Sequence, residues 1–349
     1  MIRVGLVGCG HIGAAHAHAI TELARAGLVD ARLSATFDTD AARAERFAAR
    51  FGARAVPAVD ALVAEADAVW ICTWTSGHAP VARAAAAAGR AVFCEKPLGR
   101  DLAEAETVAA VLARVPHQVG LVLRSAPVFE EMRRRVVGGE HGRVLAVAFR
   151  DDQYFPVRGT YRSAWRGEVE HAGGGTLLEH SIHDVDLLRW MLGEPVQVSA
   201  TVARRFGYPG IDDVAAVSLA FAEGATAQLT SVWHQVTARE SSRRLEVFCE
   251  DALLWTDDDN LGPLRVERSE GTDVVAGVRP EWAERLAVAP EHRAALAMYA
   301  APTKAFLDGL LDGRPGAPSA DEALAAHRIV DAAYRSAAAG GTPVRPGPG

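Results

Sequence analysis

Residues 8–20 read GCGHIGAAHAHAI, and the first six letters place three glycines in the pattern Gly-x-Gly-x-x-Gly. The apolar run IRVGLVG leads into them and predicts a strand, and residues 11–27 predict a helix. In such a unit Gly8 allows a tight turn, Gly10 allows the backbone to approach a pyrophosphate, and Gly13 allows close packing of the helix on the strand. The helix N-terminus then offers its N–H groups to the phosphates. The stretch therefore predicts a dinucleotide site rather than a turn without a ligand.

A carboxylate at the end of the second predicted strand indicates which nucleotide binds. This strand, ARLSATFD, ends at Asp38. A carboxylate at that place accepts hydrogen bonds from a ribose 2′-hydroxyl and repels a 2′-phosphate. Arg43, about one helical turn further along, leaves an interaction with a 2′-phosphate open. We therefore expect NAD in preference to NADP.

Composition limits the partners and the compartment. A chain of 349 residues with 49% hydrophobic and 23% charged residues is typical of a globular protein with two domains. Its net charge of -7 gives no basic surface for nucleic acid or anionic lipid, so we expect neither a nucleic acid nor a membrane as a partner. The four cysteines form no Cys-x-x-Cys pair, and the N-terminus lacks a signal-peptide pattern, which favours a cytoplasmic location.

Two patterns of alternation divide the chain. Up to about residue 123, apolar runs alternate with helical stretches, which predicts an N-terminal Rossmann domain with a doubly wound parallel sheet. Beyond it, strand-like segments follow one another through short turns, which predicts a C-terminal α/β domain with a large, mostly antiparallel open sheet. The expected divisions are 1–123, an NAD(P)-binding domain, 124–340, a second α+β domain, and 341–349, a flexible tail rich in Gly and Pro.

The segment EKPLG at residues 95–99 follows the fifth predicted strand. The carboxyl ends of parallel strands are where such sheets build their sites, which makes Lys96 a candidate. Pro97 restricts the residue before it to an extended conformation and so limits where Lys96 points. An exposed loop lysine without a function is the alternative. The histidines of the first predicted helix, His16 and His18, are expected to be structural.

A long helix predicted over residues 176–192 carries Glu179, His183 and Asp186 at i, i+4, i+7 spacing, with apolar residues on another face. Such a stripe is typical of acid–base chemistry or of a solvated helix face. The glycines at 173–175 favour the first interpretation, because they permit close approach of the backbone to a ligand. The same side chains, with His180, are also compatible with a divalent cation. Nothing in the sequence requires a metal, and we expect none.

Taken together, the segments GCGHIGAAH, EKPLG and GGGTLLEHSIHDVDLLRWMLG resemble the glucose-fructose oxidoreductase / inositol dehydrogenase (Gfo/Idh/MocA) family over nearly the whole chain. The resemblance implies an NAD(P)-dependent oxidoreductase that transfers hydride between nicotinamide and a secondary alcohol or ketone. The implied substrate is a small polyol, sugar, cyclitol or glycoside. The resemblance also implies that 124–340 is a substrate-binding and oligomerisation domain, and that a homodimer or homotetramer assembles through the C-terminal sheet.

The resemblance assigns roles to individual residues. His183 would be the general acid/base, and Lys96 would stabilise the developing alkoxide. Glu179 is the third catalytic candidate, and it stands where the family has Asp in an Asp-x-x-x-His motif. Trp74 stands where the family commonly has proline, and it either narrows the site near the cofactor or packs in the crevice. The implied cofactor contacts are Gly8, Gly10, His11, Ile12, Gly13, Asp38, Thr73, Trp74, His78, Glu95 and Lys96. The implied substrate contacts are Lys96, Arg124, Tyr154, Tyr161, Trp165, Arg166, His180 and His183.

Three alternatives stay open. The segment 151–175, rich in Tyr, Trp and Arg, is typical of a substrate loop and equally of an oligomer interface. A hydrolase or lyase that oxidises its substrate transiently with tightly held NAD would use the same residues. A non-catalytic nucleotide-binding regulatory protein would be expected to lack Lys96 or His183, and this chain has both.

Overall fold

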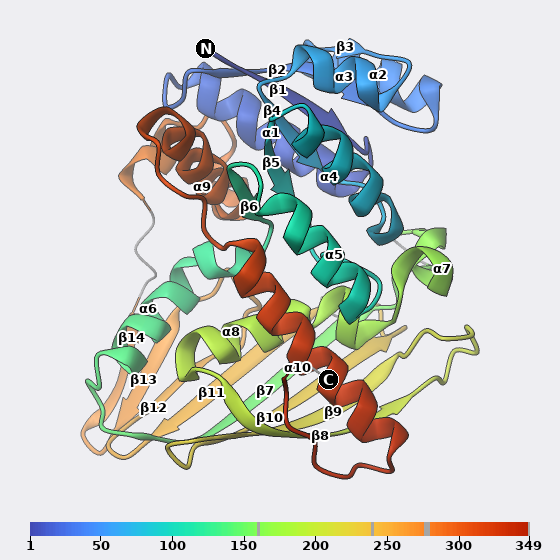
Figure 1. Cartoon of the computed structure of the whole chain (residues 1–349). Coiled ribbons are helices and arrows are strands. Elements are labelled where there is room, and N and C mark those ends of the chain that lie inside the picture. The colour runs from blue at the N-terminus through green and yellow to red at the C-terminus, as the bar shows by residue number, and fades with distance from the viewer. Residues whose placement is uncertain (159–160, 239–240, 276–279, 348–349) are drawn as a thin grey trace. The chain divides into compact units, whose positions relative to one another are not determined.

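The computed structural model describes residues 1–158, 161–238, 241–275 and 280–347. The chain divides into two compact units (Figure 1). Unit 1 consists of Met1–Ser125 and Arg279–Leu324, and unit 2 consists of Ala126–Val278 and Ala325–Gly349. The division therefore differs from the contiguous one predicted from the sequence, because a late segment of the chain returns to the first unit.

Unit 1 is built on a six-stranded sheet in the order β3-β2-β1-β4-β5-β6, and all neighbouring strands are parallel. This confirms the predicted doubly wound Rossmann sheet. A helix at 59–65 was not among the predicted elements. The elements of unit 1 are β1 (Ile2–Val7), α1 (His11–Arg25), β2 (Ala31–Phe37), α2 (Ala41–Phe51), β3 (Arg54–Ala55), α3 (Val59–Glu65), β4 (Ala68–Ile71), α4 (His78–Ala87), β5 (Ala91–Cys94), α5 (Leu102–Leu112), β6 (His117–Val119) and α9 (Pro290–Asp312).

Alternate residues of the central strands bury two separate cores, one on each face of the sheet. In β4, Val69 and Ile71 pack with residues of α3, α4 and α5. Ala68 and Trp70 point to the other face and pack with residues of α1, α2 and α9. Burial on both faces is what makes these strands short, continuous apolar runs in the sequence.

Helix α9 belongs to unit 1 because its apolar side chains complete the second of these cores. Phe306 and Leu307 are almost fully buried there. The ring of Trp70 stacks on Phe93 with centroids 5.3 Å apart, and Phe306 meets Trp70 edge-on at 5.6 Å. Aromatic contacts of this kind add to the free energy gained by burial. This packing is the physical reason why residues 279–324 return to the first unit.

Unit 2 is built on an eight-stranded sheet in the order β14-β13-β12-β11-β7-β10-β9-β8. All pairs are antiparallel except β7 and β10, which are parallel, so the predicted mostly antiparallel sheet is confirmed. The sequence interpretation missed β13 and β14. The elements are α6 (Pro127–Val137), β7 (Val144–Tyr154), α7 (Val169–Ala172), α8 (Ile182–Leu192), β8 (Pro195–Ala203), β9 (Val214–Phe221), β10 (Thr226–His234), β11 (Ser242–Cys249), β12 (Leu253–Thr256), β13 (Leu264–Arg268) and β14 (Gly271–Val275). Helix α10 (Ala320–Ala338) begins in unit 1 and ends in unit 2.

The end of the chain is more ordered than its composition suggested. Val344 forms an isolated antiparallel bridge with Val198 of β8, and each residue donates its N–H to the other's carbonyl at 2.8 Å. The tail that was expected to be flexible from residue 341 therefore pairs with the sheet at Val344. Two residues of extended backbone are enough to form such a bridge. Residues 348–349 lie outside the described part of the chain. No helix in that described part is long and apolar enough to cross a membrane.

Candidate active site

The glycine loop between β1 and α1 has the geometry that the sequence predicted. Gly8 has φ +100°, and a Cβ there would lie 2.5 Å from the carbonyl oxygen of Cys72. A Cβ on Gly13 would overlap the carbonyl oxygen of Gly8. A Cβ on Gly10, in contrast, would meet no atom within 4 Å. Gly8 and Gly13 are thus required by the fold, whereas Gly10 leaves an open approach to the backbone.

Asp38, the residue after β2, lies against this loop. Its Oδ2 accepts a hydrogen bond from the N–H of Cys9 at 2.9 Å, and its side chain is only 7% exposed. Arg43 approaches the other carboxylate oxygen, with Nη1 3.5 Å from Oδ1. The carboxylate is therefore held beside the glycine turn, where a ribose hydroxyl would meet it.

These groups fit a dinucleotide. Gly10 is the N-cap residue of helix α1 and makes no side-chain cap, so the N–H groups of the first turn remain available for phosphate oxygens. His11, the first helical residue, is exposed, whereas Ile12 packs against the core. The open side of Gly10, the uncapped helix and the carboxylate of Asp38 together form the donor and acceptor set that NAD requires.

The segment after β5 is fixed by buried hydrogen bonds. The Nε2 atom of His16 lies 2.7 Å from Oε1 of Glu95, and both side chains are buried. The other oxygen of Glu95 accepts the N–H of Lys96 at 3.1 Å. Glu95, predicted to touch the cofactor, thus supports the main chain that carries Lys96. His16 has the structural role expected of it.

His78 supports the same segment from the other side. Its Nδ1 lies 2.9 Å from the carbonyl oxygen of Pro97, and its Nε2 lies 3.3 Å from that of Thr73. Burial lowers the pKa of His78 and favours the neutral ring, which has a single N–H and can donate to only one of these two carbonyls. The carbonyl of Pro97 is the nearer acceptor, so the ring supports the Lys96 loop and lies beside the loop at Thr73 and Trp74, rather than presenting a nitrogen to the nucleotide.

Arg124, expected to bind substrate, is buried and forms an ion pair with Glu322. Removing a buried arginine from such a pair to serve a ligand costs free energy. The structure therefore favours a structural role for Arg124.

In unit 2, the predicted helix over 176–192 is two elements rather than one. Residues Thr176–His180 form a π-helical turn, closed by the N–H of Ser181 on the carbonyl of Thr176 at 2.8 Å. Helix α8 follows from Ile182. The regular stripe of Glu179 and His183 therefore does not continue across the junction.

The cause of this break lies in a distant segment. Asp212 accepts hydrogen bonds from the N–H groups of Gly175 at 2.8 Å and Leu177 at 3.0 Å. Its own carbonyl accepts the N–H of Thr176 at 2.7 Å, and Tyr334 donates its hydroxyl to Oδ1 at 2.8 Å. Gly175 is required here, because a Cβ would overlap the backbone of Asp212.

The three polar side chains of the predicted stripe are buried, so they do not form a solvated helix face. Glu179 is 4%, His183 8% and Asp186 1% exposed. Glu179 forms an ion pair with Arg166, with Nε and Oε1 2.8 Å apart. The guanidinium of Arg166 also lies 4.6 Å from the ring centroid of Trp165. Arg166, one of the expected substrate contacts, therefore contacts both the carboxylate of Glu179 and the ring of Trp165, a second expected contact.

The tyrosines of segment 151–175 differ in environment. Tyr154 is half-buried, and its ring meets His234 edge-on at 5.8 Å. Tyr161 is 45% exposed. Partial burial raises the pKa of its hydroxyl, on which Arg166 and Asp259 also act electrostatically. Residues 159–160 of this segment lie outside the described residues.

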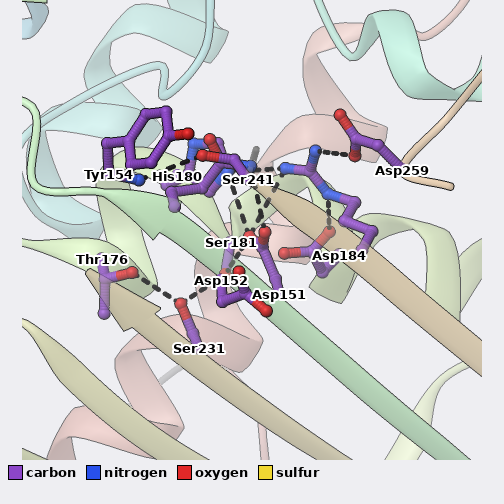
Figure 2. Close-up of polar contacts among 12 residues, drawn as sticks. Asp151, Asp152, Tyr154, Thr176, His180, Ser181, Asp184, Ser231, Ser241 and Asp259 are labelled. Atoms are coloured by element: carbon purple, nitrogen blue, oxygen red, sulfur yellow. Dashed lines mark hydrogen bonds and ion pairs between the residues drawn. The ribbon is translucent and has the colours of Figure 1, made fainter. Parts of the chain in front are cut away.

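Unit 2 also contains a buried polar cluster that the sequence interpretation did not find (Figure 2). Its centre is Arg243 of β11, which is 4% exposed and lies opposite Asp151 of β7 in the strand register. The guanidinium contacts Asp184 at 2.8 Å, Asp259 at 2.8 Å, His180 at 2.7 Å and Asp151 at 3.4 Å. The alternation of β11 was the available signal, because it places Arg243 on the same buried face as Leu245 and Val247.

Hydroxyl groups extend this cluster to the π-helical turn. Ser181 donates to Asp151 at 3.0 Å, and its oxygen lies 2.6 Å from the hydroxyl of Ser231. Ser231 in turn lies 2.7 Å from the hydroxyl of Thr176 (Figure 2). Hydrogen bonds of Thr176 and Ser181 thereby connect both ends of the turn that carries Glu179 to the sheet.

The pKa values of the two aspartates beside Arg243 are shifted in opposite directions. Burial, together with the negative charge of Asp151, raises the pKa of Asp184 well above its usual range. Burial acts in the same direction on Asp151, but Arg243 and His180 outweigh it and hold the pKa of Asp151 well below its usual range. Of the two carboxyl groups, Asp184 therefore holds a proton more readily than Asp151.

No group of three or more His, Cys, Asp or Glu side chains within the described ranges is arranged to hold a metal ion. The chemistry supported by these residues is that of hydrogen bonding, proton transfer and electrostatic stabilisation.

The sheet of unit 1 and its glycine loop define a protein of the NAD-binding Rossmann class. Comparison with family models agrees: residues 2–121 match the model described as "Oxidoreductase family, NAD-binding Rossmann fold", and residues 129–254 match the "GFO/IDH/MocA C-terminal domain". The chain belongs to the Gfo/Idh/MocA family of oxidoreductases.

Individual relatives cover almost the whole chain. It is 33% identical to an inositol 2-dehydrogenase of Rhizobium meliloti over 97% of each chain. It is 31% identical to a UDP-N-acetylglucosamine 3-dehydrogenase of Acidithiobacillus ferrooxidans, over 90% of this chain and 93% of the relative. The crystal structure of an oxidoreductase domain protein from Kribbella flavida has the same fold, with a TM-score of 0.88 and 23% identity over 100% of both chains.

Proposed function

We propose that this protein is an NAD-dependent dehydrogenase or reductase that acts on a secondary alcohol or ketone of a cyclitol, sugar or glycoside. The open approach to Gly10 beside the buried carboxylate of Asp38 is the observation that carries the proposal. The substrate class is supported by relatives named as dehydrogenases of inositol and of a nucleotide sugar.

Bound NAD supplies the acceptor for the hydride that leaves the carbinol carbon. In the direction of oxidation, His183 accepts the proton of the reacting hydroxyl as the C–O bond becomes a carbonyl. The ammonium group of Lys96 donates a hydrogen bond to the same oxygen and stabilises its developing negative charge. Reduction of a ketone reverses these roles.

Glu179 acts as an orienting group. Its ion pair with Arg166 at 2.8 Å, in a buried place, holds the carboxylate in a fixed position. Arg166, whose guanidinium lies over the ring of Trp165, then supports Glu179. Direct recognition of substrate hydroxyls is assigned to Tyr154, Tyr161 and His180, whereas Arg124 is left out because of its ion pair with Glu322.

The proposal is tested by following the absorbance of reduced nicotinamide with NAD and NADP across inositols, free sugars and glycosides. The chain has two lysines, Lys96 and Lys304, which gives a matched control. We expect Lys96→Ala and His183→Ala to lose turnover, and Lys304→Ala, which removes an ion pair with Asp308, to retain it. Nucleotide that remains bound while a glycosidic bond is cleaved, without net reduction, would instead identify an internal-redox hydrolase.

We further propose a homodimer or homotetramer assembled through the outer face of the eight-stranded sheet. In β11 this face presents Arg244, Glu246 and Phe248, and Phe248 is 42% exposed. Arg244 lies over the ring of Trp255, and exposed aromatic and arginine side chains are typical of interfaces. Light scattering of the wild type and of Phe248→Glu measures the oligomeric state and so tests this interface.

A cytoplasmic location is proposed because all four cysteines are free.

A further inference from the structure

Asp212 lies in the segment between β8 and β9 and binds three successive N–H groups at the start of the π-helical turn. Its carboxylate accepts the N–H groups of Gly175 and Leu177, and its carbonyl accepts that of Thr176. The first N–H groups of a helix have no partner within the helix itself. Gly175, the N-cap residue of this turn, has no side chain that could cap them. Asp212, whose side chain is almost fully buried, therefore takes the place of a local cap.

One path of hydrogen bonds leads from Asp212 to Glu179. The carbonyl oxygen of Gly175 accepts the N–H of Glu179 at 2.8 Å. The residue whose N–H is bound by Asp212 thus also holds the main chain of Glu179. The carboxylate of Glu179 is held separately by Arg166, with Nε and Oε1 2.8 Å apart. Both ends of the Glu179 residue, main chain and carboxylate, are therefore fixed by hydrogen bonds.

A second path leads to His183, the second residue of α8. The carbonyl oxygen of Thr176 accepts the N–H of Ser181 at 2.8 Å, which is the i to i+5 bond of a π turn. The carbonyl oxygen of Ser181 accepts in turn the N–H of Asp184 at 3.0 Å, and His183 lies between these two residues. The main chain at the start of α8 is thus held by the same turn that Asp212 caps.

Two glycines admit Asp212 and a tyrosine that supports it. A Cβ on Gly175 would overlap the carbonyl oxygen of Asp212, and a Cβ on Gly174 would lie 2.7 Å from the hydroxyl oxygen of Tyr334 in α10. This hydroxyl donates to Oδ1 of Asp212 at 2.8 Å. Burial and the charge of Asp212 raise the pKa of Tyr334 well above its usual range, so the hydroxyl keeps its proton and stays a donor. Protein groups thus lie against these glycines, where the sequence suggested a ligand.

We propose that Asp212 is a positioning residue for hydride transfer, which fixes Glu179 and His183 relative to one another through the main chain of the π-helical turn, and that Tyr334 supports it. The inference rests on the proposed function and adds two residues that touch neither substrate nor cofactor in it. The hydrogen bonds of a π turn span one residue more than those of an α-helix. A turn released from Asp212 would return to α-helical bonding and shift Glu179 relative to His183. A small displacement of a proton acceptor lowers the rate of the reaction and leaves nucleotide binding intact.

Asp213, the next residue in the sequence, gives a matched control. It is as deeply buried as Asp212, and its carboxylate accepts two backbone N–H groups at 2.6 Å. These belong to Arg205 and Phe206, which lie outside the catalytic turn. Asp212→Ala and Asp213→Ala therefore each remove two hydrogen bonds of the same kind. We expect the two variants to lose similar amounts of melting temperature.

Kinetics separate positioning from stability. Titration with NADH counts the folded binding sites, so kcat for the accepted polyol is expressed per site, and a loss of folded protein alone does not lower it. We expect Asp212→Ala to lower this kcat about tenfold with the Kd of NADH unchanged, and Asp213→Ala to keep the wild-type value. Tyr334→Phe removes one hydroxyl, should lower kcat about threefold, and decides the matter if Asp212→Ala does not fold. A wild-type kcat in Tyr334→Phe and in any folded Asp212→Ala, or an equal loss in both alanine variants, would overturn the proposal.

The surroundings of His183 are also measured without turnover. In protein labelled with ¹³C-histidine, the ring signal of His183 is identified by its absence from His183→Asn. We expect this signal to shift in Asp212→Ala and in Tyr334→Phe, and to stay in place in Asp213→Ala. An unshifted signal in all three variants would overturn the proposal. Absence of polyol turnover by the wild type would instead refute the proposed function, and these spectra would still decide whether Asp212 fixes His183.

Discussion

The imidazole of His16 and the carboxylate of Glu95 form a buried hydrogen bond of 2.7 Å that joins α1 to the segment carrying Lys96. The glycine loop begins α1, and Glu95 also accepts the N–H of Lys96. The hydrogen bonds of Glu95 thus connect the helix that follows the nucleotide loop to the main chain of the proposed catalytic lysine.

Glu95→Gln is expected to lower kcat about tenfold, because the amide forms weaker hydrogen bonds and releases the main chain at Lys96. Steady-state kinetics at saturating NAD measures this. Glu106→Gln, on the exposed side of α5, is the control and should behave as the wild type. An unchanged kcat in Glu95→Gln would show that this support is not needed for turnover.

Two glycines of the loop are expected to respond differently to alanine. Gly13→Ala should lower the melting temperature or prevent folding, because its Cβ overlaps the carbonyl of Gly8. Gly10→Ala should fold normally, because its Cβ meets no atom within 4 Å, but bind NAD about tenfold more weakly if the nucleotide fills that space. Thermal unfolding and a titration with NADH separate the two effects. Normal NAD affinity in Gly10→Ala would place the pyrophosphate elsewhere.

The choice of cofactor is expected to depend on the charge of Asp38. Asp38→Ser removes the repulsion of a 2′-phosphate and frees Arg43, whose Nη1 lies 3.5 Å from the carboxylate. The ratio of kcat/KM for NADP to that for NAD should rise by at least about tenfold. The same ratio in wild type and variant would mean that Asp38 does not contact the ribose.

Glu131 of α6 gives an expectation for acid stability. Hydrogen bonds from Arg134 lower the pKa of Glu131, and those from Arg135 add to this effect. Burial acts in the opposite direction but is outweighed, so the pKa falls from 4.5 to about 2. When folding lowers the pKa of a carboxyl group, the ionised group stabilises the folded protein at pH values above its pKa in the unfolded state. This stabilisation is lost as the pH falls through its pKa in the folded state. Glu131→Gln should therefore have a lower melting temperature at pH 7, and the difference should disappear between pH 4.5 and 2. A difference independent of pH would assign the effect to packing.

The Rossmann half of the fold was predictable because its signals are local. The glycine spacing, the apolar strands and the carboxylate at Asp38 each follow from neighbouring residues in the sequence. The residues that Gly8 and Gly13 approach also lie in this unit, at the end of β4 and within the loop itself.

The second unit was less predictable, because distant segments determine its local structure. The π-helical turn depends on Asp212, which caps it from more than thirty residues away. The cluster around Arg243 brings together β7, β11, α8 and the segment at Asp259. These segments are far apart in the sequence, so no residue spacing predicts that they are in contact. The return of α9 to unit 1 likewise depends on Phe306 and Trp70 meeting in three dimensions.

Hydride transfer itself is tested most directly by isotopic labelling. A polyol with deuterium on the carbinol carbon is incubated with the protein and NAD, and the mass of the reduced nicotinamide is measured. We expect one deuterium per NADH formed by the wild type and by Lys304→Ala, and no NADH from Lys96→Ala or His183→Ala. NADH without deuterium, or product formed with no deuterium ever reaching the nucleotide, would contradict the proposed function.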